Sequence, residues 1–245
     1  MKKKERLDKI LVDKGLVKSR ERAKALIMEG KVIVDGNRAV KAGALVGSSA
    51  DIILKGNETP CVSRGGMKLE AALAFFGIGV EGKIVMDIGC STGGFTDCAL
   101  KKKALKVYAI DVGYGQFDWA LRKDPRVQLF EKTNIRYLEK KAIPDPVAIV
   151  LIDVSFISLS KVLPKVLEFL TENGEVLALI KPQFEVGKGM VDRGGVVKDD
   201  GRRMLAVENV RAFAETIGFR VIGLFECPIR GQKGNREFFM YLGRR

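Results

Sequence analysis

Apolar residues along this chain recur either every three to four positions, as in a helix, or in short alternating or continuous runs, as in a strand. The order in which these helical and strand patterns follow one another changes near residue 60. In the first part, apolar residues recur at helical spacing within 7–11 and again within 23–27, which predicts two short amphipathic helices. The residues around Asp35 and Gly36 then alternate as in a β-hairpin, and the run 50–56 predicts a further strand. The first part should therefore fold as a small α+β domain.

Seven short apolar runs follow one another in the second part, and amphipathic stretches lie between most of them. The runs cover 83–89, 106–113, 126–132, 147–155, 175–181, 219–226 and 237–243. The stretch 201–217 has the clearest helical period. Continuous apolar strands that alternate with helices are typical of a parallel sheet covered on both faces. We therefore predict an α/β fold, a Rossmann-like domain with a mostly parallel seven-stranded sheet and helices on both faces.

The polar stretch KGNETP at 55–60 separates the two parts and contains a glycine and a proline. We predict one domain over 1–60 and a second over 63–245, with the linker near 55–62. Residues 1–60 carry 14 Lys and Arg against 8 Asp and Glu, so positive charge is concentrated at the N-terminal end. The formal net charge of +13 favours an anionic partner, either nucleic acid or an acidic membrane surface.

The residue inventory excludes several kinds of chemistry. The chain has no histidine, so neither a Ser-His-Asp triad nor a His-ligated metal can be built. Its four cysteines form no C-x-x-C pair, which argues against structural zinc, and we expect no metal site. Four cysteines among 245 residues are also too few for a disulfide framework, which indicates a reducing compartment. Since no run has the length of a signal core or a membrane span, we expect a soluble cytoplasmic protein.

Four basic residues surround the start of the second predicted helix: Lys18, Arg20, Arg22 and Lys24. Basic residues at this end oppose the helix dipole, so phosphate binding explains them better than helix stability does, and a solvated helix face is the alternative. The run S-R-x-x-A-x-x-L-I-x-x-G-x-V-x-V-D-G over 19–36 resembles the small RNA-binding domain first known in ribosomal protein S-four. The resemblance covers roughly residues 4–60, Arg6 among them, and implies binding of structured RNA.

A glycine-rich loop, DIGCSTGGF, ends the first strand of the second part. Its candidate ligand-binding residues are Asp87, Gly89, Ser91, Thr92, Gly93, Gly94 and Phe95. A dinucleotide loop requires G-x-G-x-x-G, whereas this loop reads G-x-x-x-G-G, and the G-x-x-x-x-G-K-[ST] of a Walker loop does not occur. The carboxylate of Asp87 suits a cationic ligand better than a pyrophosphate. A purely structural turn is the remaining alternative.

Further polar residues follow other predicted strands. Asp111 ends the second strand and suits the ribose hydroxyls of either S-adenosylmethionine or a dinucleotide, so it does not decide between them. Thr133 and Asn134 follow the third strand and either contact an adenine or form an ordinary turn with a helix cap. Asp153 and Lys181 end two buried apolar runs, where a charge is costly unless it is paired. Each alone fits a structural ion pair, but the two together at adjacent strand ends favour a functional site.

Motifs spread over the second part carry a resemblance to a known family. They read VSRGGMKLEAAL (62–73), MDIGCSTGGFTD (86–97), EKTNIR (131–136), LIDVSFISL (151–159), IKPQFEVGKG (180–189), GGVVKD (194–199) and GNREFF (234–239). With these motifs the segment 61–245 resembles FtsJ-type RNA 2′-O-methyltransferases. The whole chain resembles the TlyA family of rRNA cytidine 2′-O-methyltransferases, often labelled haemolysin A-like. One departure is Cys61, where the family pattern has an aromatic residue, and this puts any linker role of the position in doubt.

The resemblance implies a cofactor, a substrate and a set of catalytic residues. The cofactor is S-adenosylmethionine, and the partner is ribosomal RNA in ribosomal subunits. The substrate is cytidine in large-subunit rRNA, with small-subunit rRNA as a further candidate. The family's catalytic Lys-Asp-Lys-Glu tetrad falls on Lys68, Asp153, Lys181 and Glu237.

Without histidine, the base that takes the proton of a ribose 2′-hydroxyl must be a carboxylate or a neutral lysine. We expect Lys181 to remove this proton or to stabilise the developing oxyanion. Lys68 would hold the target phosphate or ribose and ease the loss of a proton from Lys181, and Asp153 and Glu237 would orient the two lysines.

The segment 184–198 is glycine-rich and basic, and we interpret it as a substrate-side loop that tightens on RNA. A flexible surface connection is the alternative. Further candidate RNA-binding residues are Arg64, Lys188 and Arg193. We expect Phe117 and Trp119 in the core and not as base-stacking platforms.

Four other classes of protein compete with this interpretation. A non-enzymatic RNA-binding ribosome assembly factor would not need the tetrad, and a dehydrogenase would need a dinucleotide loop. A pseudouridine synthase would lack the loop seen at 87–95. A membrane-active haemolysin, which the family label suggests, would need membrane-spanning or strongly amphipathic segments, and we find none in the sequence.

Overall fold

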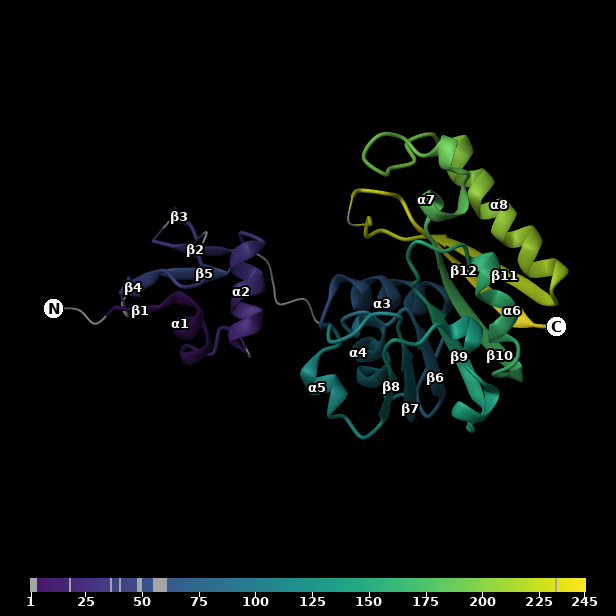
Figure 1. Ribbon diagram of the computed structural model, residues 1–245, viewed down its shortest axis with the longest axis horizontal. Coiled ribbons are helices and arrows are strands. Elements are labelled where there is room, and N and C mark those ends of the chain that lie inside the picture. Colours follow the sequence, from purple (N-terminus) through teal and green to yellow (C-terminus); the bar gives the residue numbers. More distant parts are fainter. Residues whose placement is uncertain are drawn as a thin grey trace. The chain divides into compact units, whose positions relative to one another are not determined.

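The computed structural model describes residues 4–17, 19–35, 37–39, 41–47, 50–54, 61–231 and 233–245. Contacts within the chain divide it into two compact units, Met1–Thr59 and Pro60–Arg245 (Figure 1). The first unit has one hydrophobic core and the second has two. Most of the expected linker at 55–62 lies outside the described residues.

The described residues of the first unit form two helices and five short strands. In chain order these are β1 (Lys4–Arg6), α1 (Leu7–Asp13), α2 (Arg20–Met28), β2 (Val32–Val34), β3 (Asn37–Arg38), β4 (Leu45–Gly47) and β5 (Ile52–Leu54). The expected hairpin is present, because β2 pairs antiparallel with both β3 and β5. The pairing of β1 with β4 was not predicted, since two three-residue strands so far apart leave no local pattern.

A buried carboxylate joins the two helices of the first unit. The side chain of Asp8 in α1 is fully buried. Arg6 donates two hydrogen bonds of 3.0 Å to it, and Arg20 at the start of α2 donates a third of 2.9 Å. The bond from Arg6 holds the pKa of Asp8 well below its usual range, against the effect of burial. Arg6 and Arg20 therefore stabilise this fold, and half of each side chain stays exposed.

The other basic residues expected to bind RNA have different surroundings. Arg22 is half-buried on α2, and Lys24 is exposed on the same helix. Lys18 lies outside the described residues.

The second unit contains seven strands in one sheet. Its elements are α3 (Arg64–Phe76), β6 (Ile84–Ile88), α4 (Gly94–Lys101), β7 (Lys106–Ile110), α5 (Trp119–Arg122), β8 (Val127–Phe130), β9 (Val147–Ile152), α6 (Leu163–Val166), β10 (Leu170–Ile180), α7 (Pro182–Glu185), α8 (Asp200–Thr216), β11 (Phe219–Glu226) and β12 (Phe238–Arg244), with 3₁₀ turns at Ile135–Tyr137, Lys140–Ala142, Leu159–Lys161 and Lys188–Met190. The strand order is β11-β12-β10-β9-β6-β7-β8. Strand β12 runs antiparallel to both neighbours, whereas β10, β9, β6, β7 and β8 pair in parallel. Among the described helices, none combines the length and apolar character needed to cross a membrane.

Helices cover both faces of this sheet, as predicted (Figure 1). In β9 and β10 the even-numbered residues face the core shared with α6 and α8. Toward the ends of these strands the odd-numbered residues Ile149, Leu151, Leu177 and Leu179 face the core shared with α3 and α4. Because strand side chains alternate with period two, Asp153 and Lys181, which directly follow these strands, continue the row on the α3 side.

We predict that Asp8→Asn loosens the first unit, because Arg6 and Arg20 then lose their charged acceptor. Hydrogen exchange of the α1 and α2 amides in the full chain should accelerate by about tenfold or more. Asp13→Asn is the matched control on α1, because that carboxylate is half exposed and has only a 3.9 Å ion pair with Lys9. Equal exchange rates in the two variants would contradict a structural role for Asp8.

Candidate active site

Two charged pairs lie at the edge of the sheet where β9 and β10 end. Since Ile180 pairs with Phe238, Lys181 and Glu237 occupy the next positions beyond this end of the β10–β12 ladder. Glu237 accepts a hydrogen bond of 2.6 Å from Lys68 Nζ on α3. Lys68 and Glu237 are only 8% and 2% exposed, so each charge depends on the other for compensation.

The second pair joins Lys181 and Asp153. Lys181 Nζ lies 2.5 Å from Asp153 Oδ1, and it also donates a hydrogen bond of 2.9 Å to Ser155 Oγ. Asp153 Oδ1 accepts no aligned hydrogen bond from the described residues, so this contact is an ion pair without hydrogen-bond geometry. The four residues that the resemblance nominates thus come together as two ion pairs, with Lys68 on α3, Asp153 and Lys181 directly after β9 and β10, and Glu237 directly before β12.

Small residues seat α3 against α4 and thereby place Lys68. A Cβ on Gly66 would lie 2.3 Å from the Cβ of Cys61 and 2.7 Å from the carbonyl oxygen of Gly94, so only glycine fits there. The backbone amide of Val62 donates a hydrogen bond of 2.7 Å to the carboxylate of Asp97 in α4. Cys61, where the family pattern has an aromatic residue, is buried in this contact.

The glycine-rich loop lies directly beside the end of β9. Gly89 has φ +84°, and a Cβ on it would lie 2.6 Å from the backbone oxygen of Asp153. Gly93 has φ +93°, and a Cβ there would meet Leu121 at 2.5 Å. Glycine is required at both positions because no other residue tolerates this conformation and this proximity together.

Two carboxylates flank the loop. Asp111 accepts hydrogen bonds from the backbone amides of Ser91 at 2.8 Å and Gly113 at 2.6 Å, and it remains partly exposed. Asp87 is fully buried and accepts a bond of 2.7 Å from Thr96, while its other oxygen has no partner among the described residues. Burial raises the pKa of Asp87 to about 7.

The remaining candidates for ligand contact differ in their accessibility. Ser91 and Thr92 are exposed on the loop. The ring of Phe95 is buried and packs near Phe239, so only its backbone is left for a ligand. Asn134 caps a 3₁₀ turn through a bond of 3.1 Å from the amide of Arg136. Thr133 bonds the carbonyl oxygen of its own turn. The structure therefore shows an ordinary turn at Thr133 and a cap of the 3₁₀ turn at Asn134.

The sequence pattern did not single out an exposed aromatic residue on the loop after β9. Phe156 has φ +63° and is 90% exposed, an unusual conformation and position for this residue type. Glu185 anchors its loop by accepting bonds from Ser158 Oγ at 2.6 Å and from the amide of Leu159 at 2.9 Å. Burial raises the pKa of Glu185 above its usual range. The one sequence signal was an aromatic residue just past a strand end in DVSFIS.

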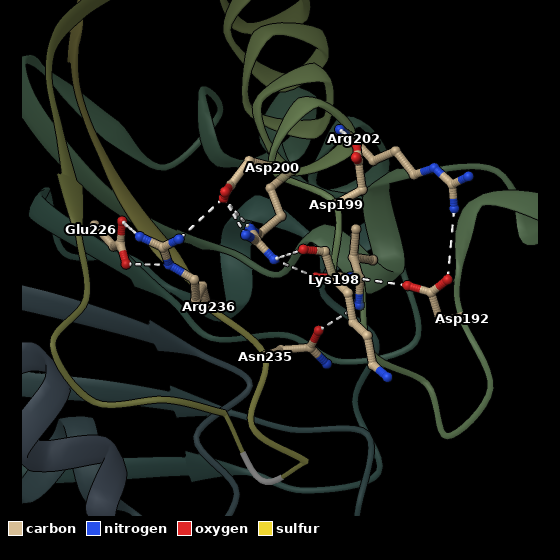
Figure 2. A network of polar contacts seen from close by, with 10 residues as sticks. Asp192, Lys198, Asp199, Asp200, Arg202, Glu226, Asn235 and Arg236 are labelled. Carbon is tan, nitrogen blue, oxygen red and sulfur yellow. Dashed lines mark hydrogen bonds and ion pairs between the residues drawn. The ribbon is translucent and has the colours of Figure 1, made fainter.

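The expected substrate-side loop is held by polar contacts, so its 191–198 part is not a loose connection (Figure 2). Asn235, which is buried, accepts a bond from the amide of Val197 and donates one to the carbonyl oxygen of Gly195, both of 2.9 Å. Arg203 donates to the carbonyl oxygens of Val197 and Lys198. The loop is thereby fixed to the segment that leads into Glu237.

The other expected RNA contacts are scattered over this unit. Arg193 is exposed on the held loop, and Arg64 is exposed but donates a bond of 2.7 Å to the carbonyl oxygen of Arg230. The side chain of Lys188 lies outside the described part of the chain.

The expectation for Trp119 was wrong. Phe117 is buried as predicted, but Trp119 is 67% exposed, with Lys123 Nζ 4.8 Å from its ring centre. Asp118 caps the four-residue helix α5. Phe117 and Trp119 lie on either side of this cap, so their side chains have different surroundings.

We predict that Gly89→Ala costs more stability than Gly77→Ala. Both glycines have positive φ, but a Cβ on Gly77, at the end of α3, would meet nothing within 4 Å. Gly77→Ala should cost about 1 kcal/mol through its backbone conformation, and Gly89→Ala should cost about 1–3 kcal/mol more through the clash with Asp153. Urea unfolding followed by the fluorescence of Trp119, the single tryptophan, measures both. Equal costs in the two variants would show that the close approach of Gly89 to the backbone oxygen of Asp153 does not matter for stability.

Two family models match the chain, the FtsJ-like methyltransferase over residues 61–244 and the S4 domain over residues 5–52. The protein named 16S/23S rRNA (cytidine-2'-O)-methyltransferase TlyA from Mycobacterium tuberculosis is 44% identical, over 99% of this chain and 91% of that protein. Hemolysin A from Brachyspira hyodysenteriae is 40% identical, over 96% of this chain and 98% of that protein. The solved structure of a Streptococcus thermophilus protein that carries a hemolysin label is 43% identical and covers 100% of this chain and 90% of its own, with a TM-score of 0.78. As its motifs predicted, the chain belongs to the FtsJ-like methyltransferase family, with an S4 domain ahead of the methyltransferase domain.

Proposed function

We propose that this chain transfers a methyl group from S-adenosylmethionine to the 2′-oxygen of a cytidine ribose in ribosomal RNA, in the cytoplasm. The observation that supports this most directly is the pairing of Lys68 with Glu237 and of Lys181 with Asp153 beside the glycine-rich loop. The reaction is the one in the name of the Mycobacterium tuberculosis relative. An S4 domain supplies the RNA-binding part that such a substrate requires.

The residues of the loop fit the proposed cofactor. The loop exposes Ser91 and Thr92, and Asp111 is partly exposed and already oriented by two backbone amides. The buried carboxyl oxygen of Asp87 that has no partner among the described residues adds an acceptor next to the loop. When bound, the cofactor supplies a methyl group on a positively charged sulfur, which is a strong electrophile.

The two lysines have separate tasks in this proposal. Lys181 Nζ would accept the 2′-hydroxyl proton or, as an ammonium, stabilise the oxygen from which the proton leaves; both tasks require Nζ at the 2′-oxygen. Lys68 donates a hydrogen bond of 2.6 Å to Glu237, so it would act mainly through its charge. Asp153 and Glu237 compensate the charges of the two ammonium groups, which are largely shielded from water.

Two other groups would hold the RNA. Phe156 follows Ser155, which bonds Lys181, and its exposed ring offers a stacking surface for a nucleobase on a loop anchored by Glu185. On the first unit, Arg22 and Lys24 would contact phosphates, together with the exposed halves of Arg6 and Arg20.

The proposal predicts transfer of labelled methyl groups from S-adenosylmethionine to the ribose of isolated ribosomal subunits. Lys181→Ala should lower the rate by at least about a hundredfold, because the 2′-oxygen loses its charged or proton-accepting partner. Lys83→Ala is the matched control, since Lys83 forms an ion pair with Glu175 and precedes β6 at its other end. Assaying the two subunits separately shows which rRNA is the substrate. RNA binding without any transfer would reject the enzyme in favour of an assembly factor.

Phe156→Ala should weaken binding of the RNA substrate with little change in turnover at saturation. Loss of one stacked base corresponds to about a tenfold rise in KM for RNA, and Phe156→Tyr should retain most of the affinity. Phe75→Ala, which removes another exposed phenylalanine at the far end of α3, serves as the control. A KM that does not change in Phe156→Ala would exclude the stacking role.

A further inference from the structure

We propose that Ser155 is the residue that aims Lys181 at the substrate. This inference rests on the proposed function, because it assigns the task of orienting a group that the proposal places at the 2′-oxygen. Ser155 lies two positions after Asp153. It contacts Lys181 through a hydrogen bond, whereas Asp153 contacts Lys181 through an ion pair.

The two contacts of Lys181 differ in kind. The ion pair with Asp153 is short, at 2.5 Å, but Asp153 Oδ1 accepts no aligned hydrogen bond from the described residues. A charge–charge attraction of this type sets the distance of the ammonium and leaves its rotation free. The hydrogen bond of 2.9 Å to Ser155 Oγ is directional, and it is the one that Lys181 Nζ donates within the described part of the chain. The serine hydroxyl therefore fixes where the remaining N–H directions or the lone pair point.

The backbone around Ser155 is rigid enough for this task. Phe156 next to it has φ +63°, a conformation that persists only where the surroundings enforce it. Glu185 enforces it from the other side by accepting bonds from Ser158 and Leu159. Ser155 and Glu185 thus join the loop after β9 to the segment after β10 at two points, one at Lys181 itself and one four residues later.

A flexible side chain makes such a guide necessary. Lysine carries a point charge on four rotatable bonds, so charge alone does not orient it. Orientation matters for transfer, because misplacing a reacting group by about 1 Å can cost a large part of the rate. Ser155 does not have to touch the substrate to have this effect, so we class it as a positioning residue.

The test compares three serine variants of the full chain in the methyl-transfer assay. Ser155→Ala should lower kcat about tenfold while the KM values for RNA and S-adenosylmethionine stay near those of the native protein. Ser155→Thr, which keeps the hydroxyl, should restore most of kcat. Ser160→Ala is the matched control, because it removes a hydroxyl that bonds Ser158 in the same loop without contacting Lys181. Ser160→Ala should keep the native kcat.

The outcomes separate this inference from the proposed function. If Lys181→Ala abolishes transfer but Ser155→Ala keeps the native kcat, the role of Ser155 is excluded and the enzyme stands. A threonine variant as slow as the alanine variant would show that the hydroxyl is not the cause. An effect on KM alone would make Ser155 a substrate contact and overturn the positioning role. If the native chain transfers no methyl group, both proposals fail together. Thermal unfolding of each variant checks that the fold is retained.

Discussion

The ion pair between Lys68 and Glu237 is the interaction on which the site depends. Its partners are 169 positions apart and both are buried, so the pair can form only when the whole unit is folded around it. Two features bring them together. The glycine contact between Gly66 and Gly94 seats α3 on α4. Strand β12 runs antiparallel to its neighbours, so its first residues lie where the parallel strands end, and Glu237 arrives beside Lys181.

Polar contacts then make the loops of this edge rigid. Glu185 ties the segment after β10 to the loop after β9, and Asn235 ties the segment at 195–197 to the residues before β12. Asn235 stands two positions before Glu237, so the segment that leads to this catalytic candidate also holds the substrate-side loop. In the proposed mechanism this rigidity would hold the groups that act on the nucleotide in place before RNA arrives, which lowers the entropic cost of aligning them.

Much of the fold could be read from local patterns. The seven apolar runs became the seven strands of the sheet, and the helical stretch at 201–217 became α8. Charged residues directly after β9 and β10 were recognisable because a charge next to a buried strand needs a partner. The pairing of β1 with β4, the anchoring of Arg6 and Arg20 on Asp8, and the exposure of Trp119 were not recognisable.

By itself the sequence determined the order and type of the main elements, the glycine-rich loop and the family to which its motifs belong. These depend on spacings of a few residues, which a single chain displays directly. Only the tertiary structure decided which acid pairs with which lysine, that Ser155 bonds Lys181, and that the neighbouring Phe156 stands exposed. Such choices depend on distances between residues far apart in the chain, and these distances are fixed by packing and strand register, not by any local period.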